Sequence, residues 1–438
     1  MKRTALTGAV LIAVFIHVPV SATERAALVA REVSAAAPGL AALYRELHAT
    51  PELSFQEVAT AAKLAARMRA LGFEVTEKVG RTGLVAVLRN GDGPVVLLRT
   101  DLDALPILEA SGLPYASAAT GAGPSGEPVP AMHACGHDVH MTSWLGAATA
   151  LAALRDRWRG TVVMIGQPAE EIGEGAEAML ADGLFTRFPR PDFALALHDM
   201  PDLPSGVVAI APGPVAASAD SVDVRFFGRG GHGAQPHTTV DPIVIAARFV
   251  VAVQTLVSRE NDPFDPAVVT VGAFHAGSKH NIIPAEAHLQ LTVRAYREEV
   301  RRRLLDGIRR VARAEAEAAD APQPPEVTVS QGTPPTCNDE ALAGRLAAAL
   351  RRDLGEGRVV AQRPIMAAED FSLYGRAGVP AVMMWLGATA PERLERARAG
   401  GPPVAPLHSP RFAPDAEATV TGGATAMALA ALELLAAR

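Results

Sequence analysis

The stretch Val95-Val96-Leu97-Leu98-Arg99-Thr100-Asp101-Leu102-Asp103 joins a short apolar run to a polar end. An apolar run of this length, preceded by Gly93-Pro94, predicts a buried strand. Similar runs occur at 84–88, 161–165 and 193–197, and the Ala-rich segment 144–154 predicts a helix between two of them. Strands that alternate with helices predict an α/β sheet with helices on both faces.

Polar side chains follow these predicted strands. Asp103 follows the first run quoted, Glu170-Glu171 follow the run at 161–165, and His198 follows the run at 193–197. In sheets of this class, functional groups gather at the carboxyl ends of the strands. We therefore expect these residues to lie along one edge of the sheet.

Cys135 and His137 stand two residues apart in a Gly-containing turn before a predicted helix, with His133, Asp138 and His140 close by. Thiolate and imidazole are good ligands for a borderline-soft divalent ion, and a bend lets both face one centre. The chain has only one other cysteine, Cys337. In an oxidising compartment a Cys135–Cys337 disulfide is the alternative interpretation.

The adjacent carboxylates Glu170 and Glu171 suggest a division of labour, in which one binds a metal while the other accepts a proton from water. An exposed acidic loop is the alternative, and the nearby Glu174 and Glu177 fit it. His198 and His408 are unremarkable alone. Together with Asp103, Cys135, His137 and Glu171, they offer enough N, S and O ligands for one or two divalent ions.

The pattern of apolar and polar residues changes near residue 213. Alternating strands, a helix over 241–258 and a charged helix over 298–319 predict an α+β unit inserted at 213–331, between parts of a larger domain at 23–212 and 332–438. The segment 24–68 is expected to be helical. In the insert, the glycine-rich turn 228–234 exposes His232, Asn281 precedes Ile282-Ile283-Pro284, and Arg294 stands in an otherwise apolar-alternating strand. Such an arginine is either solvated or clamps a carboxylate.

The chain begins with Lys2-Arg3, an apolar run over 5–20 and the small-residue pattern Val20-Ser21-Ala22. This layout predicts a signal peptide at 1–22, cleaved after Ala22, and hence a periplasmic or secreted protein with no stable membrane association after cleavage. An uncleaved anchor is the alternative.

The 438 residues carry a net charge of −6 and no basic run interleaved with aromatics, so a nucleic-acid partner is not expected.

The motifs taken together resemble a metallopeptidase family that includes aminoacylases, hippurate hydrolases, auxin-conjugate hydrolases and glutamate carboxypeptidases, nearest the N-acyl-amino-acid amidohydrolases. The resemblance runs from about residue 40 to the end of the chain. Its markers, in order, are RTDLDALP (99–106), MHACGHD (132–138), PAEE (168–171), ALH (196–198), GGHGAxPH (230–237), NIIP (281–284), AEDF (368–371) and LHSP (407–410).

The resemblance implies a mixed-sheet catalytic domain with helices on both faces and an inserted ferredoxin-like lid that forms a homodimer. By similarity, the metal ligands would be Cys135, His137, Glu171, His198 and His408, with Cys135 at a bridging position. Glu170 would be the general base and Asp103 would orient a ligand. His232 would stabilise the oxyanion across the dimer, while Asn281 and Arg294 would hold the substrate carboxylate.

The expected activity is metal-dependent hydrolysis of N-acyl amino acids, with one or two Zn, Mn, Co or Ni ions. A carboxypeptidase or dipeptidase using the same site on small peptides is one alternative. A periplasmic protein that binds a metal or ligand without turnover is another. The segments 118–130 and 391–406 look longer than the family pattern, and we expect them to border the site entrance.

Overall fold

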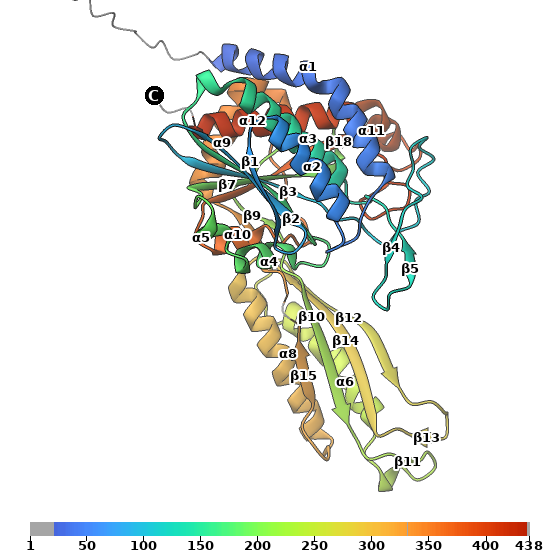
Figure 1. The fold of residues 1–438 in the computed structure, drawn as a ribbon. Coiled ribbons are helices and arrows are strands. Elements are labelled where there is room, and N and C mark those ends of the chain that lie inside the picture. Colours follow the sequence, from blue (N-terminus) through green and yellow to red (C-terminus); the bar gives the residue numbers. More distant parts are fainter. Residues whose placement is uncertain (1–21, 331, 436–438) are drawn as a thin grey trace, which may run out of the picture.

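The computed structural model describes residues 22–330 and 332–435. The predicted signal peptide at 1–22 lies almost wholly outside these residues. The chain forms a large layered domain from which a smaller, elongated lid projects (Figure 1).

The large domain is built on a mixed eight-stranded sheet, as expected. Its order is β1-β2-β6-β3-β7-β18-β8-β17. The central strands β6, β3, β7 and β18 are parallel, while β1, β2 and β8 pair antiparallel with their inner neighbours. The strands span Glu74–Val79 (β1), Gly83–Asn90 (β2), Gly160–Gln167 (β6), Val95–Asp101 (β3), Phe193–Pro204 (β7), Ala381–Thr389 (β18), Val208–Ala209 (β8) and Val359–Val360 (β17).

Helices cover both faces of this sheet (Figure 1). Side chains of a strand alternate between faces, so Leu98 joins the core on one face while its neighbour Leu97 joins the core on the other. The first face carries α1 (Ala22–Ala49), α2 (Val58–Ala70), α3 (His137–Ala153), α9 (Glu340–Leu354) and α12 (Ala416–Leu435), and the second carries α4 (Gly175–Ala181), α5 (Leu184–Arg187) and α10 (Ser372–Arg376).

The lid has the ferredoxin-like arrangement predicted for it. Its chain order is β10, α6, β12, β14, α8, β15, and its sheet order is β12-β14-β10-β15, antiparallel throughout. One apolar core joins this sheet to both helices. The elements span Asp220–Phe227 (β10), Pro242–Val253 (α6), Thr255–Ser258 (α7), Ala267–Ala276 (β12), Glu286–Ala295 (β14), Glu298–Ala318 (α8) and Glu326–Val329 (β15).

Short strand pairs complete the fold. At the junction with the lid, β9 (Gly213–Ala216) pairs with β16 (Thr336–Asn338), and at the far end of the lid, β11 (Gly231–His232) pairs with β13 (Ile282–Ile283). Single turns of 3-10 helix occupy Arg155–Arg157, Pro236–Thr238 and Glu356–Arg358.

Two expectations about local structure were wrong. The predicted helix over 24–68 is two helices, because the chain turns between α1 and α2 at Pro51, which has no N–H to donate and disfavours helix in the residue before it. The segments 118–130 and 391–406 contain a hairpin, β4 (Thr120–Ala122) with β5 (Pro128–Pro130), and a helix, α11 (Pro391–Arg398). The described residues that line the site cleft include none from either segment. The expectation that these two segments border the site entrance was therefore wrong.

Two described helices are long and apolar enough to cross a membrane by length and composition alone, namely Glu24–Ala49 within α1, and α12. The most apolar window of α12 is 72% buried, as in the core helix of a globular domain, whereas that of the N-terminal helix is 22% buried.

Candidate metal centre

The predicted site residues converge at the carboxyl edge of the central strands. Asp103 lies just beyond β3, Glu170 and Glu171 lie just beyond β6, and His198 lies within β7. Because β6, β3 and β7 are parallel neighbours, these positions meet at one edge of the sheet. The β7 strand continues past the predicted end to Pro204, so His198 belongs to the strand itself.

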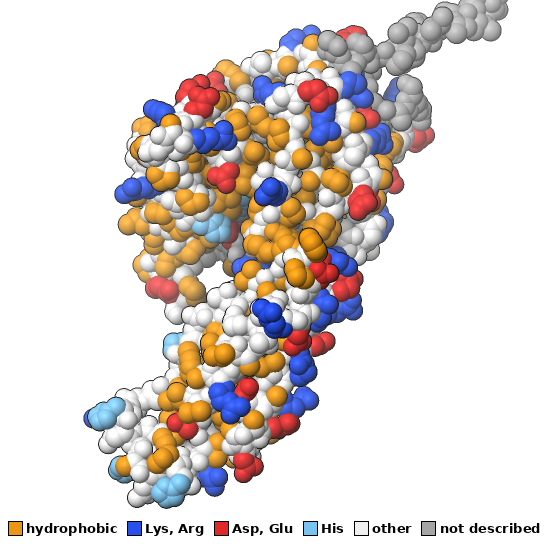
Figure 2. Space-filling view, turned by 180° about the vertical axis from the view of Figure 1, so that it is seen from behind, with side chains coloured by type: hydrophobic (Ala, Val, Ile, Leu, Met, Phe, Trp, Pro, Cys, Tyr) orange, Lys and Arg blue, Asp and Glu red, His pale blue; other side chains and the backbone are white. Residues whose placement is uncertain are grey.

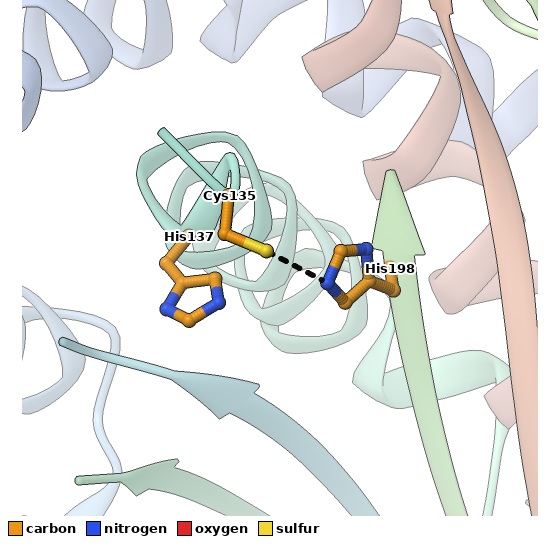
Figure 3. Close-up of side chains that lie close together, drawn as sticks. All are labelled: Cys135, His137 and His198. Carbon is orange, nitrogen blue, oxygen red and sulfur yellow. Dashed lines mark hydrogen bonds between the residues drawn. The ribbon is translucent and has the colours of Figure 1, made fainter. Parts of the chain in front are cut away.

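Cys135 and His137 enter the site from a sharp turn at the start of α3. Gly136 has a φ of +75° there, a left-handed conformation that favours glycine. A Cβ at Gly136 would also overlap the carboxylate of Asp199. The glycine therefore allows the Cys135 and His137 side chains, on either side of it, to face the same centre as His198 (Figure 3).

The Cys135 thiol is the common neighbour of two histidines from distant parts of the chain. Its Sγ lies 3.5 Å from Nε2 of His198 and 3.2 Å from Nε2 of His408. Glu171 completes the group, with its carboxylate oxygens 3.4 Å from Nε2 of His408 and 3.8 Å from Nε2 of His137. Ligand atoms of Cys135, His137 and His198, and those of Cys135, Glu171 and His408, form two compact triads that share the thiol.

This donor set fits a divalent metal ion. Nε2 of His137 and Oε1 of Glu171 are buried and have no hydrogen-bond partner among the described residues. Leaving such groups unpaired is costly, whereas a cation between them would satisfy both. Imidazole, thiolate and carboxylate are also the ligands that zinc and similar transition metals bind.

Neighbouring groups fix the orientation of the histidines. The Nδ1 of His137 donates to the carbonyl oxygen of Asp103 at 2.7 Å, and Nδ1 of His198 donates to the carbonyl oxygen of Asp199 at 2.8 Å. Each bond leaves Nε2 as the free lone pair facing the cluster, as metal-ligating histidines require. The Asp103 carboxylate also accepts the backbone N–H groups of Glu170 and Glu171, both at 3.0 Å.

Burial and like charge perturb the acidic groups. Burial, followed by the charges of Glu369 and Glu171, raises the pKa of Glu170 well above its usual range. Burial chiefly raises the pKa of Glu171 to about 7, and burial with the charge of Glu171 raises the pKa of the Cys135 thiol. Such crowding of acidic groups disfavours their charged forms unless a cation lies among them.

Both cysteines are free in the structure, Cys135 buried and Cys337 exposed. The disulfide considered from the sequence is therefore not formed, and Cys135 faces the histidines instead.

A buried ion network beneath the site escaped the sequence prediction. Arg99, 1% exposed, donates to Asp101 at 2.7 Å, to Glu369 at 2.8 Å and to Asp370 at 3.1 Å. It thereby ties β3 to the segment that places Glu369 beside Glu170. The sequence feature that could have indicated this network is Arg99 itself, which stands at the end of an apolar strand run. A charge buried in such a strand requires partners of opposite charge.

The cluster opens into a cleft of about 1000 Å³ between the large domain and the base of the lid. Arg294 lines it, and its Nη1 donates to the carbonyl oxygen of Met366 at 3.4 Å. Trp385 of β18 also lines it, and its indole packs edge-on to the His198 ring.

His232 and Asn281 are not brought to this cleft within one chain. They lie in and beside the β11–β13 pair at the far end of the lid (Figure 1). Histidine side chains gather at that end (Figure 2), where His232, His237, His275 and His280 are exposed.

The chain is similar to known hydrolases over most of its length. The model of peptidase family M20/M25/M40 matches residues 97–399. An N-acetyl-L-cysteine deacetylase of Bacillus subtilis is 37% identical over 76% of this chain and 77% of its own length. A hippurate hydrolase of Campylobacter jejuni is 38% identical over 75% of this chain and 83% of its own. A solved Bacillus subtilis structure described as a dinuclear metal-binding peptidase of family M20 has a TM-score of 0.74 at 31% identity, covering 92% of this chain and 99% of its own.

Proposed function

Because this chain belongs to peptidase family M20/M25/M40 and is a metal-dependent hydrolase of amide bonds, we propose that it cleaves N-acyl amino acids into a carboxylic acid and a free amino acid. The observation that carries the proposal is the position of Glu170, buried beside the thiol–imidazole–carboxylate cluster in a cleft that Arg294 also lines. Hydrolases named for N-acyl amino acid substrates are among the relatives.

We assign Cys135, His137, Glu171, His198 and His408 as the residues that would hold the metal, and the Cys135 thiol belongs to both triads. A divalent ion held there supplies a Lewis acid that polarises a carbonyl oxygen and lowers the pKa of water toward about 7. Asp103 keeps the Glu170-Glu171 backbone and the His137 ring in place through the bonds described above.

Glu170 moves the proton in this proposal. Its carboxylate takes a proton from the attacking water and delivers it to the leaving nitrogen. A cation held by the neighbouring ligands would favour the charged form of Glu170, which is the form that accepts the proton. The 3.8 Å separation of Oε2 from Nε2 of His137 keeps Glu170 next to the ligands.

Arg294 binds the substrate carboxylate in this scheme. Its guanidinium has a planar set of N–H donors that matches a carboxylate. The hydrogen bond from Nη1 to the Met366 carbonyl oxygen fixes the orientation of this group. Binding at this remote group would position the amide for attack.

His232 and Asn281 would complete the site from the lid of a second copy of the chain. The chain would then act as a homodimer, with His232 donating to the developing oxyanion and Asn281 holding the substrate carboxylate. Co-expressing His232→Ala with Glu170→Ala, each inactive alone, should restore activity in the mixed dimer. Failure to restore it in a purified mixed dimer would contradict this arrangement.

Export of the chain remains part of the proposal, with cleavage after Ala22. N-terminal sequencing of the protein from separated cell fractions would test it, and the mature chain should begin at Thr23.

The activity test is a substrate panel with metal analysis of the same purified sample. N-benzoylglycine, N-acetyl amino acids and matched dipeptides are compared by kcat/KM. The proposal expects N-acyl amino acids to be the best substrates. Faster turnover of dipeptides would instead identify a carboxypeptidase or dipeptidase, and bound metal without turnover of any substrate would identify a binding protein.

A further inference from the structure

Phe55 and Arg81 form a stacked pair on the wall of the cleft, away from the residues assigned above. The Arg81 guanidinium lies 3.7 Å from the centroid of the Phe55 ring, and both residues line the cleft. Phe55 is half-buried and Arg81 exposed. The guanidinium of Arg81 thus packs on the face of the Phe55 ring.

The backbone under this pair is strained. Phe55 has a φ of +60° and Arg81 a φ of +80°, in the left-handed region that side-chain-bearing residues rarely occupy. Strain of this kind gathers at functional sites, where surrounding contacts hold it.

Glu57 supplies the contact that holds Phe55 and links it to the reaction centre. Its carboxylate is fully buried and accepts the N–H of Phe55 at 2.9 Å and the N–H of Ala169 at 2.8 Å, as well as the hydroxyl of Thr82. Ala169, also at positive φ, directly precedes Glu170. The stacked pair is therefore fixed by the same carboxylate that fixes the turn leading to Glu170.

The order of strands places the pair on one side of the metal ligands. Arg81 lies in the turn between β1 and β2, at one edge of the sheet, while the ligands follow β6, β3 and β7 further in. Arg294 contacts Met366, in the segment that leaves β17 at the opposite edge. An amide held at the ligands with its carboxylate toward Arg294 thus has its acyl group directed to the Phe55–Arg81 side.

We propose that Phe55 and Arg81, with Ile172 of the same cleft, form the acyl-binding subsite, and that it selects aromatic acyl groups. This proposal rests on the proposed function. Ile172 lines the same cleft and is 53% exposed, an unusual exposure for a large apolar side chain that follows two buried carboxylates. A planar guanidinium stacks on aromatic rings, so it can bind an aromatic acyl group in this way. An acetyl group has no ring and cannot make this contact.

The test compares N-benzoyl and N-acetyl derivatives of one amino acid. The wild-type enzyme should have the higher kcat/KM for the benzoyl substrate. Phe55→Ala and Arg81→Ala should each reduce kcat/KM for that substrate by roughly 3- to 10-fold, through KM, because a lost aromatic or cation–π contact has an effect of this size. Both should change the acetyl substrate by less than about twofold, with metal content unchanged.

Two further variants serve as controls. Arg81→Lys retains the charge but not the planar stack and should behave like Arg81→Ala. Arg187→Ala removes a guanidinium that packs 5.3 Å from the Phe188 ring outside the cleft, and should leave both substrates unaffected.

Three results would overturn the proposal. Equal losses on benzoyl and acetyl substrates in Arg81→Ala would show that Arg81 binds the carboxylate common to both. Equal losses in Phe55→Ala with reduced metal content would show a merely structural role. If the metal-loaded wild-type enzyme hydrolyses neither substrate, the proposed function itself fails, a result distinct from hydrolysis of both without acyl preference.

Discussion

Gly136 packs against the carboxylate of Asp199 so closely that a Cβ at Gly136 would overlap Oδ2. This contact lets the turn bring Cys135 and His137 to one centre while Asp199 holds the His198 side of the site through its carbonyl oxygen. The turn therefore has no room for any residue larger than glycine.

Gly136→Ala should lower the free energy of unfolding and the bound metal per chain. Left-handed backbone alone costs a Cβ-bearing residue roughly 1–2 kcal/mol, and the overlap with Asp199 adds to it. Gly126→Ala is the matched control, because Gly126 has a φ of +83° and nothing within 4 Å of the added Cβ. Thermal unfolding and metal analysis of both variants check this, and equal behaviour would contradict it.

Glu170→Ala should keep the metal and lose roughly 10²- to 10⁴-fold in kcat, the usual contribution of a general acid–base. Glu174→Ala, which removes an exposed carboxylate from the same cleft, should retain activity. Kinetics and metal content measured on the same samples separate the two. Substantial turnover by the Glu170→Ala protein would refute its assignment as the base.

Mild oxidants should inactivate the enzyme through Cys135, and bound metal should protect it. Burial raises the pKa of this thiol, and the thiolate is the form that reacts with oxidants. After a chelator has removed the metal, oxidation of Cys135 should therefore be slow near neutral pH and become faster as the pH rises. Mass spectrometry should locate the modification at Cys135 when activity is lost. Cys337→Ser should lose activity at the wild-type rate, and a slower loss would implicate Cys337 instead.

His48 should make folding stability fall as pH rises. Burial lowers the pKa of His48, but hydrogen bonds to Asp138 (2.7 Å) and Glu109 (3.0 Å) and their charges outweigh burial and raise it to about 9. The pKa of His48 is thus higher in the folded chain than in the unfolded chain, where it is about 6.5. Protonated His48 therefore contributes its full stabilisation below about pH 6.5, and this contribution is lost as the pH rises through about 9.

Denaturant unfolding of the chelated protein at several pH values would measure this effect. The difference in stability between wild type and His48→Gln should be largest below about pH 6.5 and shrink toward pH 9. His275→Gln, which alters an exposed lid histidine, should follow the wild type at every pH. A difference that does not change with pH would contradict the assignment to His48.

The sequence was sufficient to predict the parts of the site that are local. The strand runs, the turn at Cys135 and the Glu170-Glu171 pair each lie within a few residues, where spacing and periodicity carry information. Their convergence was predictable because parallel strands end at a common edge.

Contacts between distant residues could not be read in this way. Arg99 and Glu369 are 270 residues apart, and Glu57 meets Ala169 across 112 residues. Nothing in the spacing of these residues predicts a meeting, and a buried carboxylate such as Glu57 looks like an exposed one in the sequence. The break between α1 and α2 was missed because helical periodicity resumes after Pro51.

The pairing of Cys135 with His408, 273 residues further along the chain, has a consequence for biogenesis. A chain still being synthesised lacks its last ligand until nearly all of its length has emerged, so it cannot assemble the full set early. Sites whose ligands lie within one short motif can capture their ion as soon as that motif appears. We therefore expect the full ligand set of this protein to form only after His408 has been synthesised, and its ion to be taken up late.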